Sequence, residues 1–352
     1  MFRSKARISG ARRPAALRLL VTASLALLVL TIGDGWSAAR AQGPALWMAS
    51  PQQTGVTGSV GGVIELRPAQ LLTSHKPHEV QILEALPPLA NATGVAFQPS
   101  GNLWVTTLNN TLLKFTPAQL SNLSVRPHPK PAVTITSSAF GFILSCLFDS
   151  HVNIWIVDPL NDAVHEISHA QLVAGTADVT PAVTITDSSD LASPAFATFD
   201  TIGNLWVSSE GNSKIVKFLA SQLTTGGTPT PPVVITSPSV NAPGQMAFDA
   251  SGNLWVANAG NSTVVEFTAA QLAASGSPAA TVILSNDGSA SLSTPWGLQF
   301  DLTHRLWVSN YATGTLSKFA PGQLRATGSP TPRISLTGLP PFSAQITFGP
   351  RY

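Results

Sequence analysis

A repeat of about fifty residues limits what this chain can fold into more than any other feature of its sequence. The unit from Met246 to Leu272 contains the run Phe-Asp-Ala-Ser-Gly-Asn-Leu-Trp-Val-Ala-Asn. The same frame recurs at 95–120, 146–172, 197–223 and 298–324. A fixed period of this length is typical of repeat architectures, in which each copy is one supersecondary unit packed against its neighbours. One tryptophan marks each complete copy: Trp104, Trp155, Trp206, Trp255 and Trp307.

The two ends of the chain together supply a sixth copy. Residues 45–49 hold the Leu-Trp signature at Trp47, but the strand that should precede it is missing. A matching strand lies near the C-terminus, where residues 344–348 resemble residues 94–97 and 245–248 of complete copies. A unit divided between the termini closes a ring, because the last strand pairs beside the first and removes the free sheet edges.

Turn residues divide each copy into four strands. In the copy around Trp255 the expected strands are 245–248, 253–257, 262–267 and 281–284. Four-stranded units repeated around a channel form a β-propeller. We therefore predict an all-β fold, a six-bladed β-propeller of four-stranded antiparallel blades, as a single domain over residues 42–352. Blade 1 is expected to be shared between residues 45–84 and 342–349.

The first 41 residues have the features of an export signal. Basic residues precede an apolar run from Leu19 to Ile32, and Ala39-Arg40-Ala41 offers a small-x-small cleavage site. The run is about 14 residues long, shorter than the roughly 20 that a membrane-spanning helix needs. We expect cleavage after Ala41 and a periplasmic or secreted protein without a membrane span. A retained N-terminal anchor is the alternative.

Removing this leader changes the sign of the net charge. Seven of the 19 Lys and Arg residues but only one of the 17 Asp and Glu residues lie in it, which leaves the rest of the chain at about −4. Nucleic-acid binding depends on clustered basic side chains, so it is not expected. The single cysteine, Cys146, cannot form an intramolecular disulfide and is expected to be a small buried residue.

The recurrent side chains have structural interpretations. The six tryptophans, counting Trp47, and the phenylalanines that end the first strand of each unit are expected to pack between neighbouring blades. Four units carry an aspartate in their first turn, where a short carboxylate accepts hydrogen bonds from the following backbone amides. We interpret these four as turn residues rather than metal ligands: Asp149, Asp200, Asp249 and Asp301.

The frame Phe-Asp-x-x-Gly-Asn-Leu-Trp-Val-x-Asn-x-Gly-Asn resembles NHL repeats and the related six-bladed propellers of the gluconolactonase family, and it is similar to streptogramin lyases. The resemblance covers residues 42–352 and implies the fold, whereas superfolds of this kind host unrelated activities. Gluconolactonase-like enzymes hold a divalent cation in the central channel. The innermost strands of this chain carry no charged residue before their phenylalanines, so that site is not transferred.

Loops supply the remaining candidates. Because successive strands alternate in direction, the second-to-third-strand turns and the connections between units share one face, and we expect that face to be acidic and free of Lys and Arg. An acidic rim at a channel mouth concentrates cations. The candidate ligand-binding or cation-binding residues there are Asp158, Asp187, Glu210 and Asp287. His165, beside Asp162, is interpreted as a surface residue rather than a general base.

Two hypotheses follow for the function. The first is a monomeric, non-catalytic binding or interaction module that takes a protein, a glycan or a small ligand on one face and needs no cofactor. The alternative is a Ca²⁺- or Mg²⁺-dependent lactonase or lyase built on the four acidic loop residues. A structural component of the cell envelope would show neither ligand nor turnover.

Overall fold

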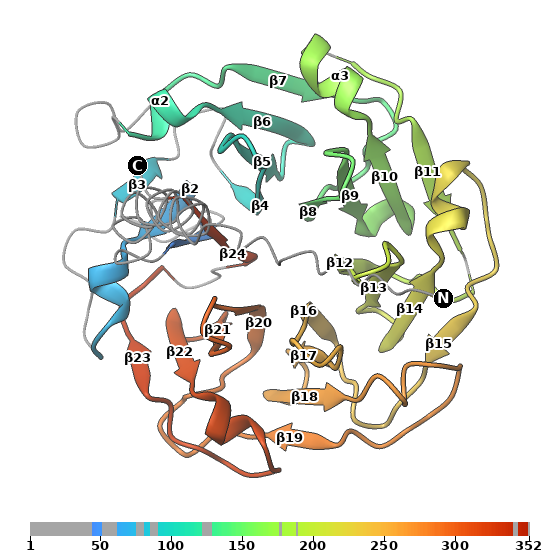
Figure 1. The fold of residues 1–352 in the computed structure, drawn as a ribbon. Coiled ribbons are helices and arrows are strands. Elements are labelled where there is room, and N and C mark those ends of the chain that lie inside the picture. The colour runs from blue at the N-terminus through green and yellow to red at the C-terminus, as the bar shows by residue number, and fades with distance from the viewer. Residues whose placement is uncertain are drawn as a thin grey trace, which may run out of the picture. The chain divides into compact units, whose positions relative to one another are not determined.

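The computed structural model describes residues 44–50, 62–74, 81–84, 91–121, 129–175, 178–187, 189–340 and 344–350. These residues form six four-stranded antiparallel sheets, which are arranged as the blades of a ring (Figure 1). The predicted six-bladed propeller is therefore confirmed. The expected leader, residues 1–41, lies outside the described residues. None of the helices in the described part of the chain combines the length and the apolar character needed to cross a bilayer.

The blades follow one another along the chain, and the innermost strand comes first in each except blade 1, whose innermost strand is the last of the chain. Blade 1 consists of β24 (Ile346–Gly349), β1 (Ala45–Ser50), β2 (Gly62–Leu66) and β3 (Gln81–Glu84). Blade 2 consists of β4 (Ala92–Phe97), β5 (Leu103–Thr107), β6 (Thr111–Phe115) and β7 (Val133–Thr136). Blade 3 consists of β8 (Ser145–Phe148), β9 (Ile154–Asp158), β10 (Ala163–Ile167) and β11 (Val183–Thr186).

The second half of the ring repeats this order. Blade 4 consists of β12 (Pro194–Phe199), β13 (Leu205–Ser209), β14 (Lys214–Phe218) and β15 (Val233–Ile235). Blade 5 consists of β16 (Pro243–Phe248), β17 (Leu254–Asn258), β18 (Thr263–Phe267) and β19 (Val282–Leu284). Blade 6 consists of β20 (Pro295–Phe300), β21 (Leu306–Asn310), β22 (Thr315–Phe319) and β23 (Ile334–Leu336).

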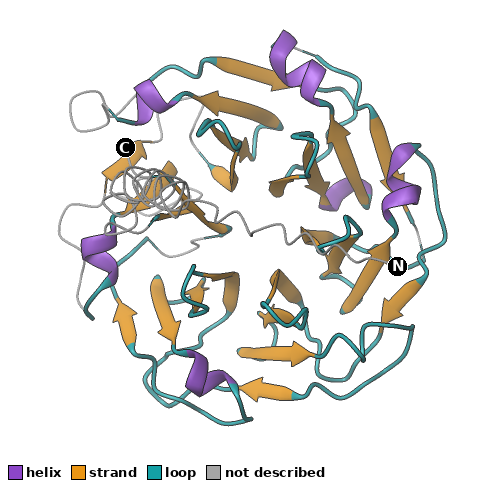
Figure 2. Cartoon of the chain, in the orientation of Figure 1, coloured by secondary structure: helices purple, strands orange, loops and turns teal. Residues whose placement is uncertain are grey.

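Helices are short and lie mainly between the third and fourth strands of a blade, toward the outside of the ring (Figure 2). The helices in these connections are η1 (Pro68–Leu71), α2 (Pro117–Leu120), α3 (His169–Ala174), η3 (Ala220–Thr224) and η4 (Pro321–Leu324), whereas η2 (Pro159–Asn161) follows the second strand of blade 3.

The two termini close the ring. Strand β24 pairs antiparallel with β1, with Phe348 opposite Leu46 and Thr347 opposite Trp47. Two backbone hydrogen bonds extend this ladder, from the Ala344 amide to the Ala49 carbonyl at 2.8 Å and from the Ala49 amide to the Gln345 carbonyl at 3.0 Å. The first and last strands of the chain thereby complete one four-stranded blade, as the divided repeat predicts.

Aromatic rings connect each blade to the next. The indole of Trp47 in blade 1 meets Phe97 of blade 2 edge to face, with ring centroids 5.4 Å apart. The same contact joins Trp206 to Phe248 at 5.9 Å, and it joins Trp307 to Phe348 across the closure at 6.4 Å. All six repeat tryptophans are at most 2% exposed. The recurrent aromatic residues therefore form the inter-blade core that the repeat predicts.

The repeat aspartates form the predicted turns and also accept the indole N–H of the repeat tryptophans. Asp200 accepts hydrogen bonds from the backbone amides of Ile202 and Asn204, and its second oxygen accepts the indole N–H of Trp206 at 3.1 Å. Asp149 and its repeat equivalents bind their own tryptophans in the same way. Each carboxylate therefore fixes the turn and satisfies the one polar group of a buried indole.

Candidate functional site

Side chains fill the central channel at its middle. The Gln345 side chain accepts hydrogen bonds from the amides of Val95 (3.1 Å) and Cys146 (3.2 Å) and donates one to the Cys146 carbonyl (2.8 Å). It thereby joins blade 1 to blades 2 and 3. Gln245 of blade 5 makes the corresponding contacts with Leu298 and Ile346. Because both amides are used for these backbone bonds, this level of the channel is a structural junction.

Aromatic residues lie above this junction, and a small well lies below it. The ring of Trp296 is 5.5 Å from that of Phe196 and 6.2 Å from that of Tyr311, which places this cluster on the face of the second-to-third-strand turns. At the opposite face a well of about 200 Å³ is lined by uncharged residues, among them Thr198 and Gln299. The inner strands thus offer no charged group at either level, as the sequence indicated.

Asp158 is the first of the four predicted site residues, and it is a fully buried backbone clamp. One carboxylate oxygen accepts the amide of Gly141 at 2.6 Å, and the other accepts the amide of Phe142 at 2.9 Å. The amides of Leu160 and Asn161 also donate to it. Burial acts to raise the pKa of this carboxyl, but the hydrogen bonds outweigh burial and hold the pKa below its usual range.

His165 is buried beside Asp158, which corrects its interpretation as a surface residue. The side chain is 2% exposed, and its Nε2 lies 3.4 Å from Oδ2 of Asp158. Its Nδ1 lies 3.0 Å from the hydroxyl of Thr184, and its ring packs against that of Phe140. The side chain is buried because its position in β10 faces the preceding blade. In the sequence, only its nearness to a turn was visible, and that nearness did not show which way the side chain points.

The other three candidates occupy separate loops. Asp187 and Asp287 each accept bonds from a serine two residues later, Ser189 and Ser289, which is the geometry of local turns. Glu210 follows β13, and burial raises the pKa of its carboxyl. Its charge also acts on Tyr311, whose pKa is raised by burial and by Glu210. Glu210 therefore lies near the aromatic cluster at the channel mouth.

The four acids are not joined to one another by any contact found among the described residues. Within the described ranges, no hydrogen bond or ion pair joins any two of them, and no group of three or more His, Cys, Asp or Glu residues is arranged to hold a metal ion. The expectation of a rim without Lys or Arg is wrong. Lys214 begins β14 on that face, and its ammonium lies 2.9 Å from Oδ1 of Asp190.

A charged position alternates in sign around the ring. In the third strand of every blade, the residue directly opposite the repeat tryptophan is charged. The glutamates stand in blades 1, 3 and 5 and the lysines in blades 2, 4 and 6: Glu65, Lys114, Glu166, Lys217, Glu266 and Lys318. Each lysine ammonium lies over the indole of its own blade, at 5.6, 5.0 and 4.7 Å from the ring centroid.

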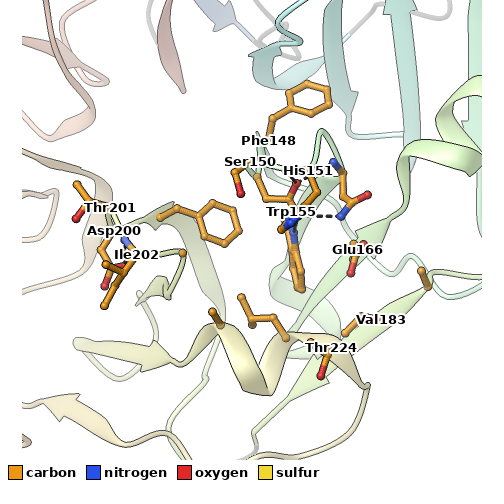
Figure 3. Close-up of a pocket in the computed structure, with 17 residues that line it drawn as sticks. Phe148, Ser150, His151, Trp155, Glu166, Val183, Asp200, Thr201, Ile202 and Thr224 are labelled. Carbon is orange, nitrogen blue, oxygen red and sulfur yellow. Dashed lines mark hydrogen bonds between the residues drawn. The ribbon is translucent and has the colours of Figure 1, made fainter.

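The grooves on the two sides of blade 4 differ in size. The groove between blades 4 and 5, which contains Lys217, has a volume of about 270 Å³. The groove between blades 3 and 4, which we call the 3/4 groove, has a volume of about 710 Å³. Its walls include Phe148, Trp155 and Glu166 of blade 3 and Phe199 and Ile202 of blade 4 (Figure 3).

Glu166 is the unusual group in the 3/4 groove. The residue is only 8% exposed, yet no hydrogen bond or ion pair to its carboxylate is found in the described part of the chain. Burial raises its pKa, and the negative charge of Asp149 raises it further, while His151 lowers it. A carboxylate in this environment is poorly compensated, which is common in binding sites.

Sequence reasoning placed the candidate site on the other face and missed Glu166. Residues of the first turns and of the helix η3 line the groove, and none of the four acidic loop residues is among its described lining residues. The signal was available, because Glu and Lys alternate at the next-to-last residue of the third strand in all six copies. The sequence does not show the space beside Glu166, which the structure gives as a groove of about 710 Å³.

Comparisons with known proteins support the fold alone. No protein-family profile matches the chain, and no curated protein matches its sequence. The structure is similar to a solved nidogen/laminin complex, with 15% identity over 87% of this chain and 98% of the other and a TM-score of 0.60. A protein of unknown function from Bacteroides caccae gives 10% identity over 87% and 99% and a TM-score of 0.57.

A streptogramin B lyase is also similar in structure, with 14% identity over 66% of each chain and a TM-score of 0.49. The six four-stranded blades confirm the fold that the resemblance implies.

Proposed function

We propose that the mature chain is a non-catalytic binding propeller and that its ligand site is the 3/4 groove. The observation that carries this proposal is a groove of about 710 Å³, within the range of small-molecule pockets, with aromatic walls and one poorly compensated buried carboxylate. The ligand is a small molecule, because the polar group lies at the base of a recess between two blades rather than on an exposed face.

The test is a ligand-observed NMR screen with a library of neutral, anionic and cationic fragments against the mature chain. Ala220→Trp fills the groove from η3, where Ala220 is exposed and lines the recess. Ala269→Trp is the matched control, because Ala269 holds the same position beside the groove between blades 4 and 5. Fragments that bind the wild type and Ala269→Trp but not Ala220→Trp support the proposal. A library without such fragments contradicts it.

The alternative, a Ca²⁺- or Mg²⁺-dependent lactonase or lyase, would use Asp158, Asp187, Glu210 and Asp287. Binding a cation through Asp158 would cost the hydrogen bonds that Gly141 and Phe142 donate to it, which weighs against this reading. The discriminating assay is hydrolysis of a lactone panel with and without chelator. Turnover that the chelator abolishes would replace the binding proposal with the enzyme.

We further propose that the chain is exported and that the leader is removed after Ala41. The basic segment, the short apolar run and the Ala39-Arg40-Ala41 site support this. N-terminal sequencing of the exported protein is expected to begin at Gln42. A mature protein that retains residues 19–32 would instead indicate an anchor.

A further inference from the structure

We infer that the 3/4 groove binds a small organic ammonium ion with an apolar group, and that Glu166 is the residue that holds its nitrogen. This inference rests on the proposed function and names the class of its ligand. The same position of the repeat carries a glutamate in blade 3 and a lysine in blade 4.

Blade 4 shows what this position does when it is a lysine. The ammonium of Lys217 lies 5.0 Å from the centroid of the Trp206 ring and 4.0 Å from Oδ2 of Asp200. The cation is thus placed between an aromatic face and the carboxylate of the first turn. Both partners favour a positive charge at that point.

Blade 3 has the same tryptophan and the same aspartate but no cation between them. The indole of Trp155 donates to Asp149 as Trp206 donates to Asp200. The lysine is replaced by Glu166, so that two carboxylates act on each other. Among the described residues that line the 3/4 groove, none is Lys or Arg. An ammonium ion from outside would therefore occupy the place of the missing lysine and meet two negative charges.

The remaining walls indicate the rest of the ligand. Phe148 and Phe199 are half-buried, and Ile202 is 77% exposed at the rim, so apolar surface surrounds the route to Glu166. An alkyl or aryl group on the ammonium would bury this surface. Asp149 adds negative charge to the lining, whereas Asp200 already has the ammonium of Lys217 4.0 Å from its Oδ2, and His151 is the one basic residue among the described lining residues.

The groove between blades 5 and 6 offers an internal contrast. It also holds a glutamate, Glu266, but its volume is about 410 Å³ and Arg325 and His304 line it. Asn253 supplies a hydrogen bond to Glu266, which Glu166 lacks. Glu266 thus already has a hydrogen-bond donor and basic side chains beside it, so we expect no ammonium site in that groove.

The test is calorimetric titration of the mature chain with 2-phenylethylammonium and with 2-phenylethanol, its neutral counterpart. We expect one site that prefers the ammonium. Glu166→Gln should weaken that binding at least about tenfold, the loss that follows from removing one charge-assisted partner worth about 1.5 kcal/mol. Glu266→Gln is the matched control and should leave the affinity unchanged.

Two charge exchanges sharpen the test. Glu166→Lys restores the pattern of blade 4 and should abolish binding, whereas Lys217→Glu should create a second site between blades 4 and 5. Circular dichroism and the melting temperature establish that each variant is folded. Failure of both charge exchanges to change the stoichiometry, in folded variants, overturns the inference.

The outcomes separate this inference from the proposed function. Equal affinity for the ammonium and the alcohol, or no effect of Glu166→Gln, overturns the inference while the binding function stands. If no library fragment and neither probe binds in the 3/4 groove, both fail.

Discussion

The channel junction at Gln345 gives the most quantitative prediction about the fold. Gln345 is 7% exposed, and its amide satisfies three backbone groups in two other blades. Gln345→Met keeps the length of the side chain but removes every one of these bonds. Each unsatisfied buried backbone group costs about 1–3 kcal/mol, so the free energy of unfolding should fall by at least about 3 kcal/mol.

The assay is equilibrium unfolding in urea, followed by tryptophan fluorescence. With an m value of about 3 kcal/mol/M, the midpoint should fall by about 1 M. Gln299→Met is the control, because Gln299 is half-buried and accepts only the amide of its neighbour Phe300, at 3.3 Å, among the described residues. Its loss should stay below about 1 kcal/mol. Equal losses for the two variants would refute the reasoning that Gln345 holds three blades together.

Three further predictions concern single side chains. Burial raises the pKa of the Cys146 thiol to about 12, so Ellman's reagent at pH 8 should label the native protein only as fast as it unfolds, and immediate labelling would contradict this burial. Because burial raises the pKa of Glu166 above its unfolded value of about 4.3, the fold is penalised as the pH rises through that range. Glu166→Gln should therefore raise the melting temperature at pH 7, and the gain should vanish below pH ~4; a gain independent of pH would count against the charge as its cause. Asp158→Ala should cost about 3 kcal/mol in urea unfolding, since four amides lose a buried partner, whereas Asp287→Ala should cost less than ~1 kcal/mol; similar costs would contradict the clamp.

The periodic part of this structure could be predicted from the sequence. Trp206 has an equivalent in all six blades and Asp200 has one in four, because each makes the same contact where it recurs, so the repeat itself reports on the packing. The closing of the ring was predictable for the same reason, since the half-units at the two termini complement each other. The expected strand 245–248 differs from β16 (Pro243–Phe248) only at its first residues.

Features that do not recur in every copy could not be predicted in this way. Gln345 contacts blades 2 and 3 from blade 1, and Gln245 of blade 5 makes the corresponding contacts with blades 6 and 1, but the other four copies have no glutamine at this position. The prediction of an acidic rim free of Lys and Arg was wrong for a related reason. The number of charged residues on a face does not show that backbone amides already donate hydrogen bonds to Asp158, or that Lys214 forms an ion pair with Asp190.

Glu166 lies between these two cases. Its position repeats, and the alternation of its sign with Lys217 is visible in the sequence. The consequence depends on space, because Lys217 lies over its tryptophan beside a groove of about 270 Å³, whereas Glu166 lines a groove of about 710 Å³. Charge patterns within a repeat therefore indicate candidate sites when the framework residues around them are constant.

The most direct measurement is a crystal structure of the mature chain grown with saturating 2-phenylethylammonium. Our account predicts density between blades 3 and 4, with the nitrogen within ~4 Å of the Glu166 carboxylate and the phenyl ring against Phe148 or Phe199. An empty 3/4 groove at a concentration that saturates binding in solution, or a ligand seated at Trp296 in the channel mouth, would contradict it.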